Sequence, residues 1–350
     1  MAVQALVSAN LTVGLDVGDQ RSSWCAIDSG GQVAGRGEVR TAAGPLRTLA
    51  TRWGRSRVVV EVGTHSPWVS RLFADLGHEV LVANARQLRL IYGRDRKNDR
   101  VDAETLARLG RVDPSLLRPI RHRGLAAQAD LAQLRARDGL VRARTQLINH
   151  VRGAVKAMGG RLPACSARAF AAAAPAHLPP ALVPALAPVL EQIATLTTQI
   201  RNMERELALL ARERYPETAH LRQVPGVGPL IALCYVLTLE DPHRFTSSRS
   251  IGAYLGLCPR QADSGSYRPQ LRISKRGDEM LRRLLVNGAQ YILGPFGPET
   301  DLRRWGLQLA ARGGKNAKKR AVIAVARKLA TLLHRLWVDG TPYQRVRAVA

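Results

Sequence analysis

Residues 12–18, with the sequence TVGLDVG, decide the fold predicted for the first part of the chain. This short apolar run ends at a glycine, a pattern typical of a buried strand. Two segments, SSWCAIDSGG (22–31) and QVAGRGEVRT (32–41), follow it and are predicted as two more strands with a Gly-Gly turn between them. The apolar run is therefore expected to begin a meander of three strands.

Alternation of helix and strand follows the meander. Predicted helices and strands succeed one another at residues 45–53 (helix), 57–63 (strand RVVVEVG), 67–76 (helix), 78–84 (strand HEVLVAN) and 98–111 (helix NDRVDAETLARLGR). Three strands in meander order followed by alternating elements is the order of an RNase H-like α/β fold. We expect this domain to span residues 11–115, with its first and fourth strands as neighbours.

The middle of the chain, residues 124–215, has helical periodicity. Apolar residues recur at spacings of three and four, as in a coiled coil, at Leu190, Ile193, Leu196, Ile200, Met203, Leu207 and Leu210. This seam suits a helical hairpin within the chain or a contact between subunits, and we expect it to serve both in part. The Ala/Pro-rich stretch 163–188 is predicted to be a connector.

The last part, residues 221–340, is basic and mostly helical, with helices predicted at 281–292 and 315–336. Its opening sequence VPGVGP (224–229) resembles the hairpin of a helix-hairpin-helix. Gly226 and Gly228 would let backbone amides approach a DNA or RNA phosphate closely. An ordinary Pro-Gly turn is the alternative.

Charge is the most informative feature of the composition. The chain has 350 residues, and 53 Lys and Arg against 27 Asp and Glu give a net charge of +26. Because like charges in such excess repel one another, nucleic acid is the first partner to consider.

The rest of the composition indicates a folded protein. Hydrophobic residues make up 46% of the chain, so most of it should fold. We expect no membrane span, and four scattered cysteines without a CxxC pair suit a reducing cytoplasm rather than a structural zinc site.

Four carboxylates occupy informative positions. Asp16 lies in the first predicted strand, Glu61 ends the fourth, and Asp99 and Asp102 are one helical turn apart. A carboxylate in a buried strand is unfavourable unless it is paired or holds a cation. If the four converge, their oxygen ligands favour Mg²⁺ or Mn²⁺. The alternatives are a turn residue for Asp16, a strand-end ion pair for Glu61, and macrodipole-favoured helix residues for Asp99 and Asp102.

A second informative stretch, residues 254–285, is YLGLCPRQADSGSYRPQLRISKRGDEMLRRLL. Ser264 and Ser266 flank Gly265 in a polar loop, which by composition alone would be only a turn. The cations around it in sequence are Arg260, Arg268, Arg272, Lys275 and Arg276. Nearby cations would stabilise a serine alkoxide and a phosphate that it attacks. A later stripe is a candidate contact for the nucleic-acid backbone and comprises Lys315, Lys318, Lys319 and Arg320.

Taken together, these motifs resemble the transposases of the bacterial insertion sequence 110 family, relatives of the Piv DNA invertase. The resemblance runs from about Leu11 to Leu336. In the first part of the chain it rests on Asp16 and Glu61 in predicted strands and on the DxxD motif within KNDRVDAETLA. In the last part it rests on PGVGP, RFTSSRSIGAYLGLCPRQADSG and ISKRGDEMLRRLL. The family more often has SSGG where this chain has Asp263-Ser264-Gly265-Ser266, which leaves Ser264 the favoured nucleophile and Ser266 the alternative.

The resemblance implies a RuvC-like domain, a coiled-coil segment and a C-terminal transposase domain. It implies Mg²⁺ held by Asp16, Glu61, Asp99 and Asp102, and a serine that joins covalently to DNA. It also implies donor and target DNA as substrates, a structured guide RNA, and a homo-oligomer whose active sites combine the two catalytic domains from different subunits.

Three other functions remain open from the residues alone. A metal-dependent junction resolvase would use water as nucleophile and would need the acids but not Ser264. An actin-like ATPase or sugar kinase also begins with a GLDVG-like hairpin, although no second phosphate loop follows. A non-catalytic nucleic-acid-binding protein would tolerate the loss of any single carboxylate.

Overall fold

The computed structural model describes residues 11–84, 99–265, 267–269 and 271–346. The chain divides into two compact units, Met1–Arg123 and Gly124–Ala350, called here the first and the second unit. The predicted division of the second unit into a helical segment and a C-terminal domain stays a prediction.

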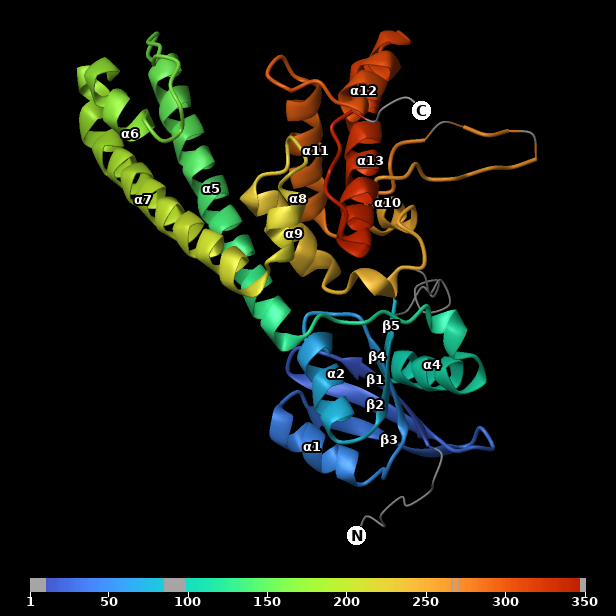
Figure 1. Cartoon of the computed structure of the whole chain (residues 1–350). Helices are drawn as coiled ribbons and strands as arrows, with labels where there is room; N and C mark the ends of the chain where they lie inside the picture. The colour runs from blue at the N-terminus through green and yellow to red at the C-terminus, as the bar shows by residue number, and fades with distance from the viewer. Residues whose placement is uncertain (1–10, 85–98, 266, 270, 347–350) are drawn as a thin grey trace. The chain divides into compact units, whose positions relative to one another are not determined.

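A five-stranded sheet forms the centre of the first unit (Figure 1). Its elements are β1 (Thr12–Val17), β2 (Arg21–Ile27), β3 (Val33–Arg40), α1 (Ala43–Thr51), β4 (Arg57–Glu61), α2 (Ser66–Asp75), β5 (Glu79–Ala83) and α4 (Asp99–Val112). The strand order is β3-β2-β1-β4-β5, with β1 antiparallel to β2 and parallel to β4. The predicted strands and the neighbouring positions of the first and fourth strands are confirmed.

Both faces of this sheet are covered. Val13, Leu15, Val58 and Val60 pack with Leu46 and Phe73 on the side of α1 and α2. On the other side, Val59 packs with Leu106, and Cys25 with Ala103 and Ala107, beneath α4. Because side chains alternate along a strand, the two sets come from alternating positions of the same strands.

The second unit is mostly helical. Its helices are α5 (Leu125–Ala157), α6 (Phe170–Ala173), α7 (Val183–Arg214), α8 (Glu217–Leu221), α9 (Pro229–Leu239), α10 (Ser250–Tyr254), α11 (Glu279–Leu293), α12 (Asp301–Ala311) and α13 (Ala317–Asp339). Buried α9 lies at its centre, with α11, α13 and the start of α5 contributing to the same core. The two helices predicted near the C-terminus are therefore confirmed as α11 and α13.

Helices α5 and α7 pack against each other as a long pair (Figure 1). Four residues of the predicted seam are buried in this unit, namely Leu190, Ile193, Ile200 and Leu207. The seam thus serves a contact within the chain, whereas supercoiling and a contact between subunits stay predictions. Among the described residues, one helix, Pro180–Arg214, is long and apolar enough to cross a membrane by length and composition alone.

Two sequence-based assignments need correction. The prediction that the connector extends to Pro188 is wrong, since α7 already begins at Val183. Pro184 lies in the first helical turn, where a missing N–H removes no hydrogen bond. Helix α12 was not predicted, although Thr300 caps it by accepting a hydrogen bond from the Arg303 amide at 3.0 Å and Asp301 lies in its first turn.

Candidate active site

The first two predicted acids lie on neighbouring parallel strands. Asp16 in β1 and Glu61 at the end of β4 each directly follow the paired residues Leu15 and Val60. Because Leu15 and Val60 point into the core beside α1 and α2, the alternating side chains of Asp16 and Glu61 project from the opposite face. Both acids are half-buried. The interpretation of Asp16 as a turn residue is wrong, because Asp16 lies within the strand.

Helix α4 covers the face from which these two acids project. At Gly14, a Cβ atom would lie 2.0 Å from the carbonyl oxygen of Ala103 and 2.5 Å from the amide nitrogen of Ala107. The glycine therefore lets the helix backbone rest directly on β1. Asp102, only 8% exposed, immediately precedes Ala103 on this helix. Asp16, Glu61 and Asp102 are thus brought to the same side of the sheet.

The fourth predicted acid, Asp99, is the first residue of α4, one turn before Asp102. Its side chain lies outside the described residues. Carboxylates of this kind supply the hard oxygen ligands that Mg²⁺ and Mn²⁺ prefer, so the donor set fits the predicted metal. Within the described part of the chain, no group of three or more His, Cys, Asp and Glu side chains is gathered closely enough to hold a metal ion. A site built from all four acids stays a prediction.

The same edge of the sheet carries a histidine to which the sequence analysis assigned no role. His65 follows β4 by four residues, and its Nε2 lies 3.1 Å from Oδ1 of Asp19, which follows β1. Its Nδ1 accepts a hydrogen bond from the Trp68 indole at 3.0 Å. His65 therefore links the segments that follow β1 and β4. No ligand spacing in the sequence could have indicated this contact.

Ser264 lies on an extended excursion of the second unit, residues 257–275, called here the serine arm (Figure 1). The Ser264 amide donates to the Tyr267 carbonyl at 3.1 Å, and the Tyr267 amide donates to the Ser264 carbonyl at 2.9 Å. This tight turn contains Gly265 at φ +55°, a left-handed conformation that favours glycine. Ser264 is exposed. Ser266 lies outside the described residues, so the preference for Ser264 stays a prediction.

The two ends of the serine arm are held together by a clasp of Gly256, Gly277 and Arg282. A Cβ on Gly256 would lie 2.1 Å from the Arg276 carbonyl oxygen, and one on Gly277 would lie 2.0 Å from that of Tyr254. The buried Arg282 guanidinium of α11 donates to the Leu255 carbonyl at 3.1 Å and to the Arg276 carbonyl at 3.0 Å. The clasp gives the RGDEMLRR motif a physical role that the sequence analysis missed.

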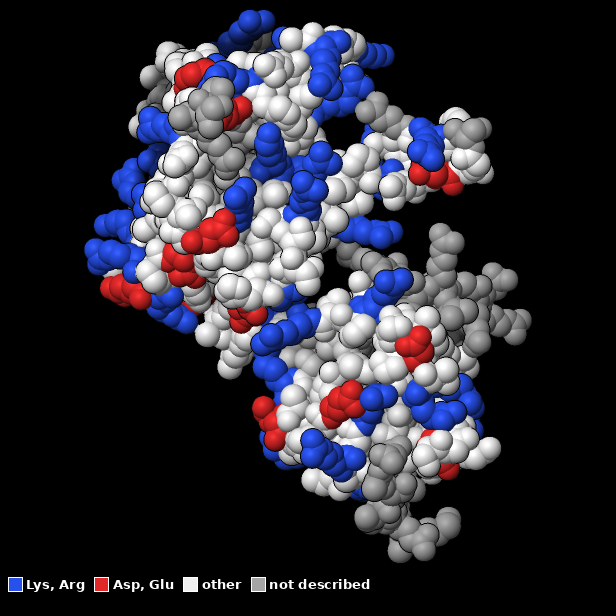
Figure 2. Space-filling view, turned by 45° about the vertical axis from the view of Figure 1, so that its right-hand side comes forward, with Lys and Arg blue, Asp and Glu red and all other residues white. Residues whose placement is uncertain are grey.

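The predicted cations lie in or next to the serine arm and at or just before the start of α13. All are exposed, and they are Arg260, Arg268, Arg272, Lys275, Arg276, Lys315, Lys318, Lys319 and Arg320. Basic side chains are prominent on the face of the second unit seen in Figure 2. The structure brings Arg272 and Lys275 of the arm to one cavity with Lys319 and Arg320 of α13. The other five predicted cations are not among the residues that line this cavity.

The VPGVGP turn joins α8 to α9. Gly226, at φ +84°, packs against α11, since its Cβ would lie 2.8 Å from the Gly288 carbonyl oxygen. The close backbone approach that Gly226 permits here is therefore to another helix. Gly228 precedes the first residue of α9. Phosphate binding by Gly226 and Gly228, and the helix-hairpin-helix assignment, stay predictions.

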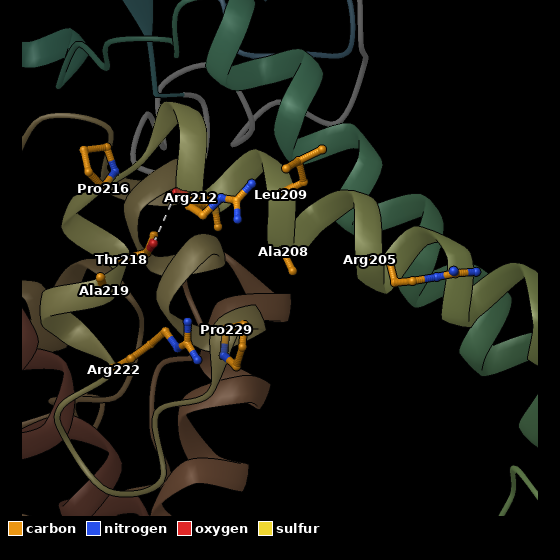
Figure 3. Close-up of a pocket in the computed structure, with 10 residues that line it drawn as sticks. Arg205, Ala208, Leu209, Arg212, Pro216, Thr218, Ala219, Arg222 and Pro229 are labelled. Atoms are coloured by element: carbon orange, nitrogen blue, oxygen red, sulfur yellow. Dashed lines mark hydrogen bonds between the residues drawn. The ribbon is translucent and has the colours of Figure 1, made fainter.

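A cavity of about 560 Å³ opens beside this turn (Figure 3). Its cations are Arg205 and Arg212 from α7 and Arg222, which follows α8, and its floor includes Ala208 and Pro229. Figure 3 shows the Arg222 side chain extending toward Pro229. Three arginines around an apolar floor add a second basic hollow, which the sequence analysis did not anticipate because its residues come from three separate segments.

Comparison with known proteins covers both candidate regions. Residues 218–301 match the family model described as Transposase IS116/IS110/IS902 family, and residues 13–159 match a second transposase model, of the DEDD type of IS110 elements. The chain is 30% identical to the transposase for insertion sequence element IS1111A of Coxiella burnetii over 340 residues, 95% of this chain and 91% of that protein.

Other relatives extend the comparison. A probable family 20 transposase of Pseudomonas aeruginosa is 30% identical over 95% of this chain and 98% of its own length. The pilin gene-inverting protein of Moraxella bovis is 27% identical over 37% of this chain and 41% of its own length. The fold and these relatives define the class of the protein, which is an enzyme, a DNA transposase. More particularly, the chain belongs to the IS116/IS110/IS902 family of insertion-sequence transposases.

Proposed function

We propose that this transposase cuts and rejoins DNA through a covalent link between Ser264 and a DNA phosphate, with Mg²⁺ bound by the acids of the first unit. One observation carries the proposal: Asp16, Glu61 and Asp102 come from β1, β4 and α4 and lie on the same side of the sheet. Carboxylate oxygens are the ligands that Mg²⁺ and Mn²⁺ prefer, so acids on one side of a sheet are suitable residues for holding such an ion. An exposed serine among arginines supplies the nucleophile that the acids lack.

The metal would be held by Asp16, Glu61, Asp99 and Asp102. When bound there, Mg²⁺ supplies positive charge to a phosphate in transfer. Asp16 and Glu61 are only half-buried, so neither residue is sealed inside the core of the first unit.

The serine supplies the chemistry. Its hydroxyl oxygen attacks the phosphorus and loses its proton, the bond from phosphorus to the 3′ oxygen breaks, and that oxygen takes up a proton. The products are a 5′-phosphoserine link and a free 3′-hydroxyl. A 3′-hydroxyl of another strand then attacks the same phosphorus, and the serine oxygen leaves and regains its proton. The number of phosphoester bonds is unchanged throughout, so no ATP is required.

Trapping the covalent adduct tests this proposal. Purified protein is incubated with donor and target DNA and Mg²⁺, denatured, and digested so that a nucleotide attached to a peptide is identified by mass spectrometry. We expect the adduct at Ser264, and Ser264→Ala should abolish it while DNA binding persists. The matched control is Ser266→Ala, which should still form the adduct. Cleavage by Ser264→Ala without any adduct would favour the junction-resolvase alternative, in which water is the nucleophile.

The resemblance also motivates a composite active site, and complementation tests it. We propose that the acids and the serine that act on one phosphate come from different subunits of a homo-oligomer. Ser264→Ala and Asp102→Asn are each expected to be inactive alone. Mixed before assembly, they should recover part of the activity, because some sites combine an intact acidic set with an intact serine. No recovery in verified mixed oligomers would contradict the composite site.

A structured guide RNA completes the proposal. The net charge of +26 and the cations of the arm and α13 support a polyanionic partner besides DNA. Purification of the protein co-expressed with the DNA that flanks its gene, followed by sequencing of bound RNA, tests this partner. Recovery of one defined non-coding RNA is expected, whereas only fragments of abundant cellular RNA would contradict the guide.

A further inference from the structure

The cavity at the foot of the serine arm has a volume of about 870 Å³. Residues from both sides of the arm near its base, from α11, and from Asn316 and the first half of α13 line it. This volume is within the range of about 300–1,000 Å³ typical of small-molecule sites. The segments are distant in sequence, so the cavity exists only in the folded second unit.

Part of the cavity lining is apolar, called here the apolar floor, and two carboxamides also line the cavity. Leu257 and Leu271 come from the arm, Val286 from α11, and Val322 and Ile323 from α13. The polar groups are the side chains of Gln290 and Asn316. A carboxamide both donates and accepts hydrogen bonds, which is what the edge of a nucleobase requires.

Cations also line the cavity. Those that line it are Arg272, Lys275, Lys319, Arg320 and Arg327, and no Asp or Glu is among its lining residues. Within the described part of the chain, Arg272, Lys275, Lys319 and Arg327 form no ion pair with an acidic side chain. Four cations without an ion pair in one hollow, Arg272, Lys275, Lys319 and Arg327, favour a ligand that carries more than one negative charge.

We infer that this cavity holds an unpaired nucleotide of the DNA strand that is cut, with its base on the apolar floor and its flanking phosphates on the surrounding cations. Apolar side chains and hydrogen bonds to the base edge are how proteins hold a base taken out of its stack. Phosphates favour the guanidinium and ammonium groups around it. This inference rests on the proposed strand transfer and adds to it a site that positions the strand.

The position of the cavity favours DNA over RNA as its occupant. Pro259 and Ile273, which form an isolated bridge between the two sides of the arm, line the cavity, and Ser264 is five residues beyond Pro259. The chain between them spans at most about 17 Å. The strand seated here is therefore the one whose phosphate lies within a few nucleotides of Ser264.

A matched pair of double variants tests the cavity. The cavity variant is Arg272→Glu with Lys319→Glu, and the control is Arg268→Glu with Lys318→Glu. Each changes the net charge equally, each takes one exposed residue from the arm and one from α13, and only the first pair lines the cavity. The full-length protein is titrated with a short fluorescein-labelled DNA of mixed sequence, as a single strand and as a duplex.

We expect the cavity variant to bind the single strand about tenfold more weakly than the control does, while both bind the duplex equally. Two lost phosphate contacts should also lower the slope of log affinity against log salt for the single strand by about 1.4. Equal losses in the two variants would overturn the inference. A selective loss for single-stranded RNA of the same sequence, with DNA binding unchanged, would overturn it as well, because the occupant would then be RNA.

A variant without charge change tests the base-binding floor. Ala324→Phe fills part of the floor, and Ala324→Ser is its size control. The probe is the same single strand with a fluorescent adenine analogue that brightens when it leaves the base stack. Wild type and Ala324→Ser should brighten it, and Ala324→Phe should not, with all three unfolding at the same temperature. Brightening that survives Ala324→Phe would overturn the inference, while the serine adduct reports separately on the proposed function.

Discussion

The acidic side of the first unit and the serine arm of the second unit hold the residues proposed for catalysis in opposite ways. Asp16, Glu61 and Asp102 lie on two paired strands and a helix that is seated on the sheet through Gly14. Ser264 lies at the tip of an arm that is held at its base by Arg282 and by backbone hydrogen bonds between its two sides. A metal requires ligands in fixed geometry, whereas a nucleophile must move between a free and a phosphate-bound state. Rigid elements suit the first task and a clasped arm suits the second.

The largest expected effect comes from the acidic side. Asp102→Asn keeps the shape of a buried side chain and removes one negative charge, so strand cleavage should fall by about 10³-fold while the unfolding temperature changes little. Cleavage assays and thermal unfolding of the same preparation measure both. A large loss of stability with modest loss of cleavage would indicate that Asp102 serves a structural ion pair.

Gly14 tests the rigidity of this region. Gly14→Ala places a methyl group 2.0 Å from the backbone oxygen of Ala103, so α4 must move off the sheet at a cost of about 3 kcal/mol in unfolding free energy. Chemical unfolding of the variant should show this loss together with impaired cleavage. Gly44, where an added Cβ meets no atom within 4 Å, provides the control as Gly44→Ala. Equal stability of the two variants would contradict the close seating of α4.

A substitution in the clasp tests how the base of the serine arm is held. Arg282→Met leaves the Leu255 and Arg276 carbonyls without the buried donor, at a cost of about 2 kcal/mol. Amide hydrogen exchange should accelerate at Arg260, Ser274 and Lys275, whose amides are bonded across the base of the arm. The control is Arg283→Met on the same helix, which removes a part-buried ion pair to Asp138 away from the base of the arm and should leave those amides protected.

The smallest effect concerns the helical support of the second unit. Burial and the bond that the Tyr215 hydroxyl donates to Asp130 raise the pKa of Tyr215 to about 12. The unfolded tyrosine has a pKa of about 10, so the contribution of the neutral phenol to stability is complete below about pH 10 and is lost as the pH rises toward about 12. Unfolding free energy should therefore fall more steeply across this window in wild type than in Tyr215→Phe. If unfolding free energy falls equally steeply with pH in the two proteins, a group other than Tyr215 determines the pH dependence in this window.

Much of the first unit could be predicted from the chain alone, since each strand is a local pattern. The run around Asp16, the Val-rich strand before Glu61 and the order of elements led to the correct sheet. Local signals were weaker in the second unit. Helix α12 was missed despite the capping residue Thr300, and the start of α7 was placed too late because prolines near Pro184 suggested a connector.

The amino-acid sequence by itself determined the strand order, the acidic residues on the strands and the family, because alternation, glycine turns and motif order are properties of the chain. Only the tertiary structure decided that α4 rests on Gly14, that Arg282 joins the two ends of the serine arm, and that Arg272 and Lys319 line one cavity. These contacts join residues that are far apart in sequence. Which of them form depends on how side chains pack in three dimensions, and no local pattern records that outcome.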